Sequence, residues 1–87
     1  MTDADETRAQ LDVALSELGV AMAILNSLEA TVENMKTIVT VLGVGSNIMA
    51  REHLIAQALS RTMVEISTIH VRLQRLVPAL EDWRRSV

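Results

Sequence analysis

The chain has 87 residues, 49% of them hydrophobic, with a formal net charge of −3, one tryptophan and no cysteine, phenylalanine or tyrosine. This length has room for a single domain, 1–87, which buries proportionally little surface and often needs a partner. The lack of cysteine excludes disulfides and thiolate metal sites, and an acidic chain without a basic cluster is a poor nucleic-acid binder. Leu, Ile, Val, Met and Ala remain to build a core, which is the composition of packed helices.

Apolar residues in the first half recur at helical spacing. They form two runs, Leu11, Leu15, Leu18, Met22 and Leu25, then Leu28, Val32, Met35, Val39 and Leu42. The extra step of three between the runs overwinds the seam locally but keeps it facing inward. Asp3 with Glu6 fits a capping box, and the β-branched run 37–41 has no second strand-like segment to pair with. We therefore expect a helix over about 4–42.

The central stretch VLGVGSN carries two of the three glycines. A dinucleotide-binding loop requires a third glycine where Ile48 stands, and a phosphate loop requires a lysine, but none occurs after position 36. Gly43 stands where a left-handed residue would end the first helix, and Ser46 or Asn47 can cap the second. We therefore expect a turn at Gly43-Gly45, over 43–46, and no phosphate-binding loop.

The second half carries the more regular pattern. Ten positions alternate steps of four and three, namely Ile55, Leu59, Thr62, Ile66, Ile69, Leu73, Leu76, Leu80, Trp83 and Val87. This heptad seam is typical of a coiled coil and predicts a helix over about 47–86. Pro78 cannot donate its amide, so we expect a kink near 74–77, with a separate short C-terminal helix as the alternative.

The two helices are expected to form an all-α antiparallel hairpin. A fold at Val44 makes facing residue numbers add to about 88, which places Leu73 opposite Leu15. Gly19 then requires a close helix crossing to offset its cost of about 1 kcal/mol. The predicted core and oligomer seam consists of Leu15, Met22, Leu25, Val32, Ile55, Leu59, Ile66, Ile69, Leu73, Leu76 and Leu80.

More apolar residues lie beside this seam. Those on the second helix recur every seven residues, at Met49, Ala56, Met63, His70 and Val77; those on the first are Val13, Val20, Ile24, Ile38 and Val41. A stripe wider than one helix can cover implies further helices. We therefore expect self-association into a four-helix bundle of two hairpins or a higher helical oligomer. The candidate partner contacts are Met49, Met63, His70 and Trp83.

No residue constellation indicates catalysis, a cofactor or a metal. The Glu-x-x-His spacing of di-iron bundles is missing around His53 and His70. The acidic N-terminus does not fit a signal peptide, and no uncharged stretch reaches the length of about 20 residues that a membrane span requires. We expect a non-enzymatic, cytoplasmic structural or adaptor module that binds itself, or another helical protein, without nucleic acid or membrane span. Export without a signal peptide is the alternative location.

Two resemblances suggest other functions. Arg8, Lys36 and the pair Arg51-Glu52 resemble the substrate-gripping positions of the all-helical chorismate mutases, which are of similar size. This resemblance implies a helical enzyme for a dianionic substrate, as a remote alternative.

The length, the lack of cysteine and the central turn resemble the small helical hairpins exported by type VII secretion systems. Leu42-Gly43-Val44 stands in place of their Trp-x-Gly turn, and Val87 follows Trp83 where their C-terminal export motif has an acid. This resemblance implies a secretion-linked hairpin that pairs with another helical subunit, which is the leading alternative function.

Overall fold

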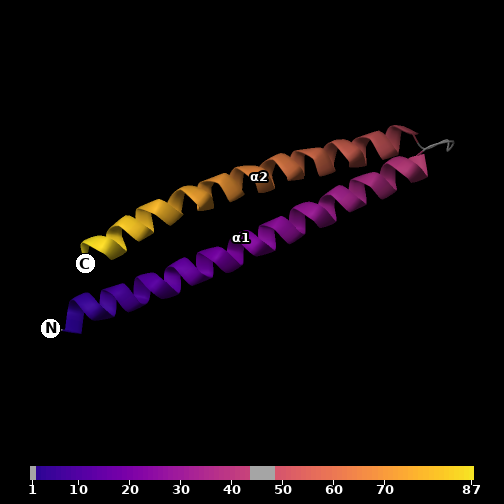
Figure 1. Ribbon diagram of the computed structural model, residues 1–87. Helices are drawn as coiled ribbons and strands as arrows, with labels where there is room; N and C mark the ends of the chain where they lie inside the picture. Colours follow the sequence, from indigo (N-terminus) through magenta and orange to yellow (C-terminus); the bar gives the residue numbers. More distant parts are fainter. Residues whose placement is uncertain (1, 44–48) are drawn as a thin grey trace.

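The structure, a computed structural model, describes residues 2–43 and 49–87. Helix α1 spans Thr2–Gly43 and helix α2 spans Met49–Ser86. The two helices run antiparallel along their whole length, so both chain termini lie at one end (Figure 1). The expected all-α hairpin is therefore confirmed. The expected turn residues beyond Gly43, with the caps Ser46 and Asn47, lie outside the described residues.

The β-branched segment 37–41 is helical, as expected. The hydroxyl groups of Thr37 and Thr40 donate hydrogen bonds to the carbonyl oxygens of Glu33 and Lys36, at 3.1 and 2.9 Å. These bonds to the preceding turn satisfy the hydroxyls inside the helix, so they do not draw the backbone into another conformation.

Helix α2 continues through Pro78 to Ser86 as a single helix. The alternative of a separate short C-terminal helix is therefore wrong. Proline lacks the amide that would bond the carbonyl oxygen of Gln74, but both residues are exposed, so water can satisfy that oxygen. Arg84 and Arg85 in the last turn complement the negative end of the helix dipole.

The contact between the helices follows one unbroken heptad on each of them. The buried or half-buried residues of α1 in this pattern are Arg8, Leu11, Leu15, Leu18, Met22, Leu25, Glu29, Val32, Lys36, Val39 and Gly43. Those of α2 are Glu52, Ala56, Leu59, Met63, Ile66, His70, Leu73, Val77, Leu80, Arg84 and Val87. Among the described residues, the buried hydrophobic side chains are Leu11, Leu18, Val32 and Ile66. The core is therefore a single narrow seam.

Contacts at both ends of the hairpin fix its register: Arg8 with the backbone carbonyl of Val87, Asp12 with Arg84, and Gly43 with Glu52. In each pair the residue numbers add to 95 or 96, so the expected sum of about 88 is wrong by one heptad. Leu15 lies level with Leu80, and Leu73 lies level with Met22. The reason is that Gly43 packs against Glu52, whereas a fold at Val44 would have set Gly43 against position 45.

This register also corrects the predicted seam of α2. Ile55, Ile69 and Leu76 were expected at the contact with the first helix, but they are 43 to 48% exposed. The column expected beside the seam takes their place, at Ala56, Met63, His70 and Val77. Both columns flank the shared column that contains Ile66, so either one can complete a heptad, and packing against α1 selects the column with His70.

On α1 the predicted extra step of three does not occur. Leu28, Met35 and Leu42 are exposed, and the heptad continues through Glu29 and Lys36, which are half-buried. These two long side chains can cover the seam with their aliphatic stems while their charged ends reach water. An uninterrupted helix thus keeps its heptad at the cost of two polar residues in the contact.

The two helical glycines have different surroundings. Gly43 is buried and its φ lies outside the left-handed region, so the expected left-handed helix end is wrong. A Cβ atom there would lie 3.0 Å from the Cβ of Glu52, which means that Gly43 permits close approach of the helices. Gly19 was expected at a close crossing, but a Cβ atom there would meet nothing within 4 Å.

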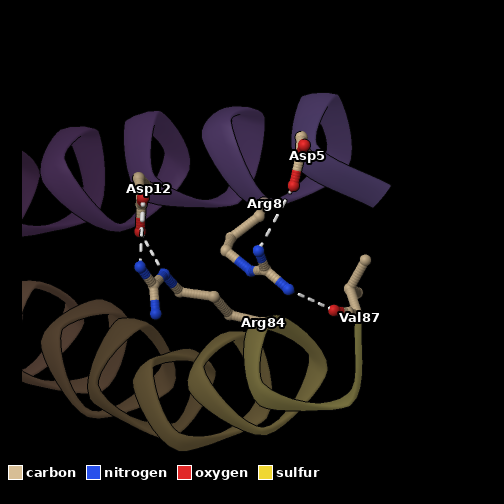
Figure 2. A network of polar contacts seen from close by, with 5 residues as sticks. All are labelled: Asp5, Arg8, Asp12, Arg84 and Val87. Atoms are coloured by element: carbon tan, nitrogen blue, oxygen red, sulfur yellow. Dashed lines mark hydrogen bonds and ion pairs between the residues drawn. The ribbon is translucent and has the colours of Figure 1, made fainter. Parts of the chain in front are cut away.

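A polar network joins the helices at the chain ends (Figure 2). Arg84 donates two hydrogen bonds to the carboxylate of Asp12, and the Nη2–Oδ2 distance is 3.3 Å. The Nη1 atom of Arg8 lies 3.5 Å from Oδ1 of Asp5, and its Nη2 atom donates a hydrogen bond to the carbonyl oxygen of Val87. The hydrogen bonds from Arg84 lower the pKa of Asp12 below its usual value of 3.8, and those same bonds raise the pKa of Arg84.

The glycine contact gives a first prediction. Gly43→Ala forces Glu52 and its helix apart, and overpacking of this kind typically costs about 1–3 kcal/mol. The matched control is Gly19→Ala, which meets no neighbour and should stabilise by up to about 1 kcal/mol through helix propensity. Urea unfolding of both variants measures the difference. Equal stabilisation by the two substitutions would contradict the close contact of Gly43 with Glu52.

The Asp12–Arg84 pair gives a second prediction. Because the folded pKa of Asp12 is lowered, its contribution to stability is present above the unfolded pKa and is lost as pH falls through the folded value. When pH falls from 5 to 2, the melting temperature of wild type should therefore fall further than that of Asp12→Asn. Circular dichroism melts at both pH values test this. Identical losses would show that the pair does not hold the helices in register.

Candidate functional site

Among the described residues, seven of the exposed large apolar side chains lie in a row along the hairpin. They occupy heptad position g, which directly precedes the contact column that contains Glu29 on α1 and His70 on α2. Their side chains are 42 to 68% exposed. We call them the open apolar face: Leu28, Met35 and Leu42 of α1 with Ile55, Ile69, Leu76 and Trp83 of α2. The face consists of side chains that each helix could bury only against a further element.

Both helices contribute to the same side of the hairpin. In an antiparallel pair, the g positions of the two helices fall on one side of the contact and the e positions on the other. Leu42 and Ile55 accordingly line one depression of about 120 Å³, together with Val39 and Gly43. At the turn end the two helices therefore share one apolar surface.

The opposite side of the contact is polar. Its residues are Asp12, Gly19, Asn26, Glu33 and Thr40 on α1, and His53, Ser60, Ser67, Gln74 and Glu81 on α2. The Asp12–Arg84 pair lies on this side. We call it the polar side; Val64 and Val71, which are 66% and 43% exposed, adjoin it on α2 and line depressions there together with Ser60 and Ser67.

The flanks of the open apolar face differ between the helices. Around α1 exposed apolar residues are more numerous, at Val13, Val20, Ile24, Ile38 and Val41, which are 53 to 66% exposed, although Glu17 and Thr31 share the column of Ile24 and Ile38. Around α2 the adjoining column alternates small and charged residues, at Ala58, Glu65, Arg72 and Ala79. Among the described residues, neither Glu65 nor Arg72 forms an ion pair.

The dimensions of the hairpin explain why so much surface is uncovered. The accessible surface is 6463 Å², whereas a compact chain of this mass exposes about 5,100 Å². The radius of gyration is 19.8 Å, against about 12 Å for a compact domain of this length. A rod of 70 × 15 × 12 Å has no interior beyond the seam, so apolar residues outside the seam meet solvent.

The residues predicted as a seam are divided between two places. Buried or half-buried at the helix contact are Leu15, Met22, Leu25, Val32, Leu59, Ile66, Leu73 and Leu80, whereas Ile55, Ile69 and Leu76 lie on the open apolar face. Leu28, Met35 and Leu42 belong to the exposed face although they were expected in the seam. The signal that separates them from Val32 and Val39 was the phase of the first run: the heptad of Leu11 to Leu25, continued without the extra step, passes through 29, 32, 36 and 39.

The candidate partner contacts are also divided. Trp83 is 55% exposed and lies on the open apolar face. Met63 and His70 are half-buried at the contact between α1 and α2, because the register places them level with Val32 and Leu25; their expected contact with a partner stays a prediction. Met49 begins α2, but its side chain lies outside the described ones.

The charged residues that suggested an enzyme do not converge within the chain. Arg8 lies at the chain ends, bonded to Val87, whereas Arg51 lines the depression beside Gly43 at the other end of the 70 Å rod. Lys36 lies between them at the helix contact. In the part of the chain that the structure describes, no group of three His, Asp or Glu side chains is placed to hold a metal ion.

Helix α1 is long and apolar enough to cross a membrane by length and composition. An 18-residue window of α1 has a mean hydropathy of 1.5, and 11% of that window is buried in the hairpin. The expectation that the chain has no membrane span therefore stays a prediction.

No protein-family model, curated protein or solved structure matches the chain. Its function must therefore be inferred from the residues and the geometry of the hairpin.

Proposed function

We propose that the chain is a non-enzymatic structural or adaptor module that binds a second copy of itself through the open apolar face. Two hairpins packed by these faces form a four-helix bundle. The observation that supports this proposal is the set of seven large apolar side chains, each 42 to 68% exposed, on one side of the helix contact. Exposed apolar patches of this extent mark interaction sites in soluble proteins.

The size of the uncovered surface suits one further hairpin. The chain exposes roughly 1,400 Å² more than a compact protein of its mass, and a standard protein–protein interface buries about 800 Å² on each partner. A second hairpin supplies two helices along the full length of the face, whereas a single helix could cover only part of its width. The same surface on both partners makes the contact self-complementary.

A second copy suits the surface better than a lipid bilayer. Although α1 is apolar enough to span a membrane, it lies against α2 from the chain ends to Gly43. Helix α2 carries six arginines, and charged side chains are expensive in a bilayer. A spanning α1 would have to take these arginines into the bilayer or abandon its contact with α2.

The test compares Ile69→Asp with Ser67→Asp, which adds the same charge two residues away on the polar side. Wild type should have twice the 9.6 kDa chain mass by light scattering. Ile69→Asp should reduce the mass to that of one chain, because an unpaired charge cannot be buried between hairpins. Ser67→Asp should keep the wild-type mass. A folded wild-type monomer, or an Ile69→Asp variant with unchanged mass, would contradict the proposal.

The behaviour of the purified wild-type chain also distinguishes a second copy from other molecules that could cover the face. A chain that aggregates or loses fixed packing alone, and becomes a defined complex only when co-expressed with a different helical subunit, would replace the second copy by that subunit. Flotation of the wild-type chain with phospholipid vesicles, in preference to self-association, would replace it by a membrane.

A further inference from the structure

The open apolar face and the positions level with it have a size gradient along the hairpin. Each g position of α1 has a nearest g position on α2, and the residue numbers of the two add to 97. From the chain ends to the turn end, these level pairs are Ala14–Trp83, Ala21–Leu76, Leu28–Ile69, Met35–Thr62 and Leu42–Ile55. On α1 the small residues lie toward the chain ends and the large ones toward the turn end. Leu28 and Ile69 form the middle pair, with two pairs on either side.

A second copy can cover this face in two orientations. In the aligned orientation both turns lie at one end, and α1 packs on the α2 helix of the partner. In the reversed orientation the turns lie at opposite ends, and each helix packs on its own counterpart. The two orientations bring different residues together, so the face itself can discriminate between them.

Side-chain volumes are compatible with both orientations. The aligned orientation sets Ala21 against the partner's Leu76 and Ala14 against the partner's Trp83. The reversed orientation sets Ala21 against the partner's Met35 and Ala14 against the partner's Leu42. Because a small residue of α1 meets a large one in either case, the charges on the flanks discriminate between the orientations.

Charges on the α2 flank favour the reversed orientation. In the reversed orientation Glu65 lies level with the partner's Arg72, and Arg72 with the partner's Glu65, so two equivalent ion pairs form across the symmetry axis. Ala58 then meets the partner's Ala79, which lets the α2 helices approach closely. In the aligned orientation Arg72 instead lies beside the partner's Ile24, so a charge is set against an apolar side chain.

The flank of α1 carries one charged residue on this side, Glu17, which the reversed orientation sets level with the partner's Ile38. The outward-facing residues of α1 between Val20 and Leu42 on this side are uncharged, and Ile24 and Ile38 are 61% and 57% exposed. The preference for the reversed orientation therefore rests on the charge pairs of the α2 flank.

We propose that the second copy binds in the reversed orientation, with the two-fold axis at the Leu28–Ile69 layer and reciprocal Glu65–Arg72 ion pairs. This inference rests on the proposed self-association and assigns its geometry. The interface is then closed, because a two-fold axis uses the face of both copies completely. The product is a dimer with one turn at each end.

Cross-linking tests the orientation, since the chain has no cysteine of its own. Leu28→Cys and Ile69→Cys each place two thiols at the axis, and a short bismaleimide should convert each variant alone into a covalent dimer. In the aligned orientation neither variant reacts alone, but an equimolar mixture of the two gives a mixed covalent dimer. Ser67→Cys, on the polar side, is the matched control and should stay uncross-linked.

Charge reversal tests the ion pairs independently. Glu65→Arg and Arg72→Glu should each weaken dimerisation about tenfold by setting like charges level across the axis, and the double variant should restore it. Glu81→Arg, on the polar side, should leave the dissociation constant unchanged. Sedimentation equilibrium measures all four constants. Equal weakening in the double variant would contradict reciprocal pairing.

The outcomes separate this inference from the proposed function. A wild-type monomer overturns the proposed self-association and this geometry with it. A dimer that cross-links only in the mixture of Leu28→Cys and Ile69→Cys, or in none of these samples, leaves self-association standing and overturns the reversed orientation.

Discussion

The structure depends on one constraint: an antiparallel pair of helices can bury only one stripe of each helix. Here each helix carries two adjoining apolar stripes. The first stripe, around Leu18 and Ile66, is buried in the seam, and the second, which contains Leu28 and Ile69, stays exposed. Because exposed apolar surface is the main term that drives association, the fold of one chain leads directly to the expectation of a second.

The register connects that constraint to function. The Asp12–Arg84 pair at the chain ends and the Gly43–Glu52 contact at the turn end hold the same register over the whole rod. A shift by one heptad would keep the seam apolar but would remove both contacts. It would also change which g positions lie level, so the size gradient and the middle layer of the open apolar face exist only in this register. The contacts at the two ends thus determine the shape that the apolar face offers to a partner.

The sequence predicts the two helices and the hairpin, because heptad spacing is a local signal and the glycines interrupt it once. It does not predict which apolar column faces the other helix. Ile69 and His70 both flank the column that contains Ile66, and hydropathy favours Ile69, yet His70 lies at the contact. The register of the two helices determines which column faces α1, and the register in turn depends on the contact of Gly43, at the end of α1, with Glu52. Periodicity therefore finds the apolar stripes, but only packing assigns each stripe to its partner.

The fluorescence of Trp83, the single tryptophan, reports most directly on whether the open apolar face is covered. Its side chain is 55% exposed in one hairpin, and it would lie between hairpins in the proposed bundle. If a second copy covers the face, the emission maximum at micromolar concentration is that of a buried indole and shifts to longer wavelength on dilution. Emission of a solvent-exposed indole at every concentration, from a chain that stays fully helical, would contradict the account.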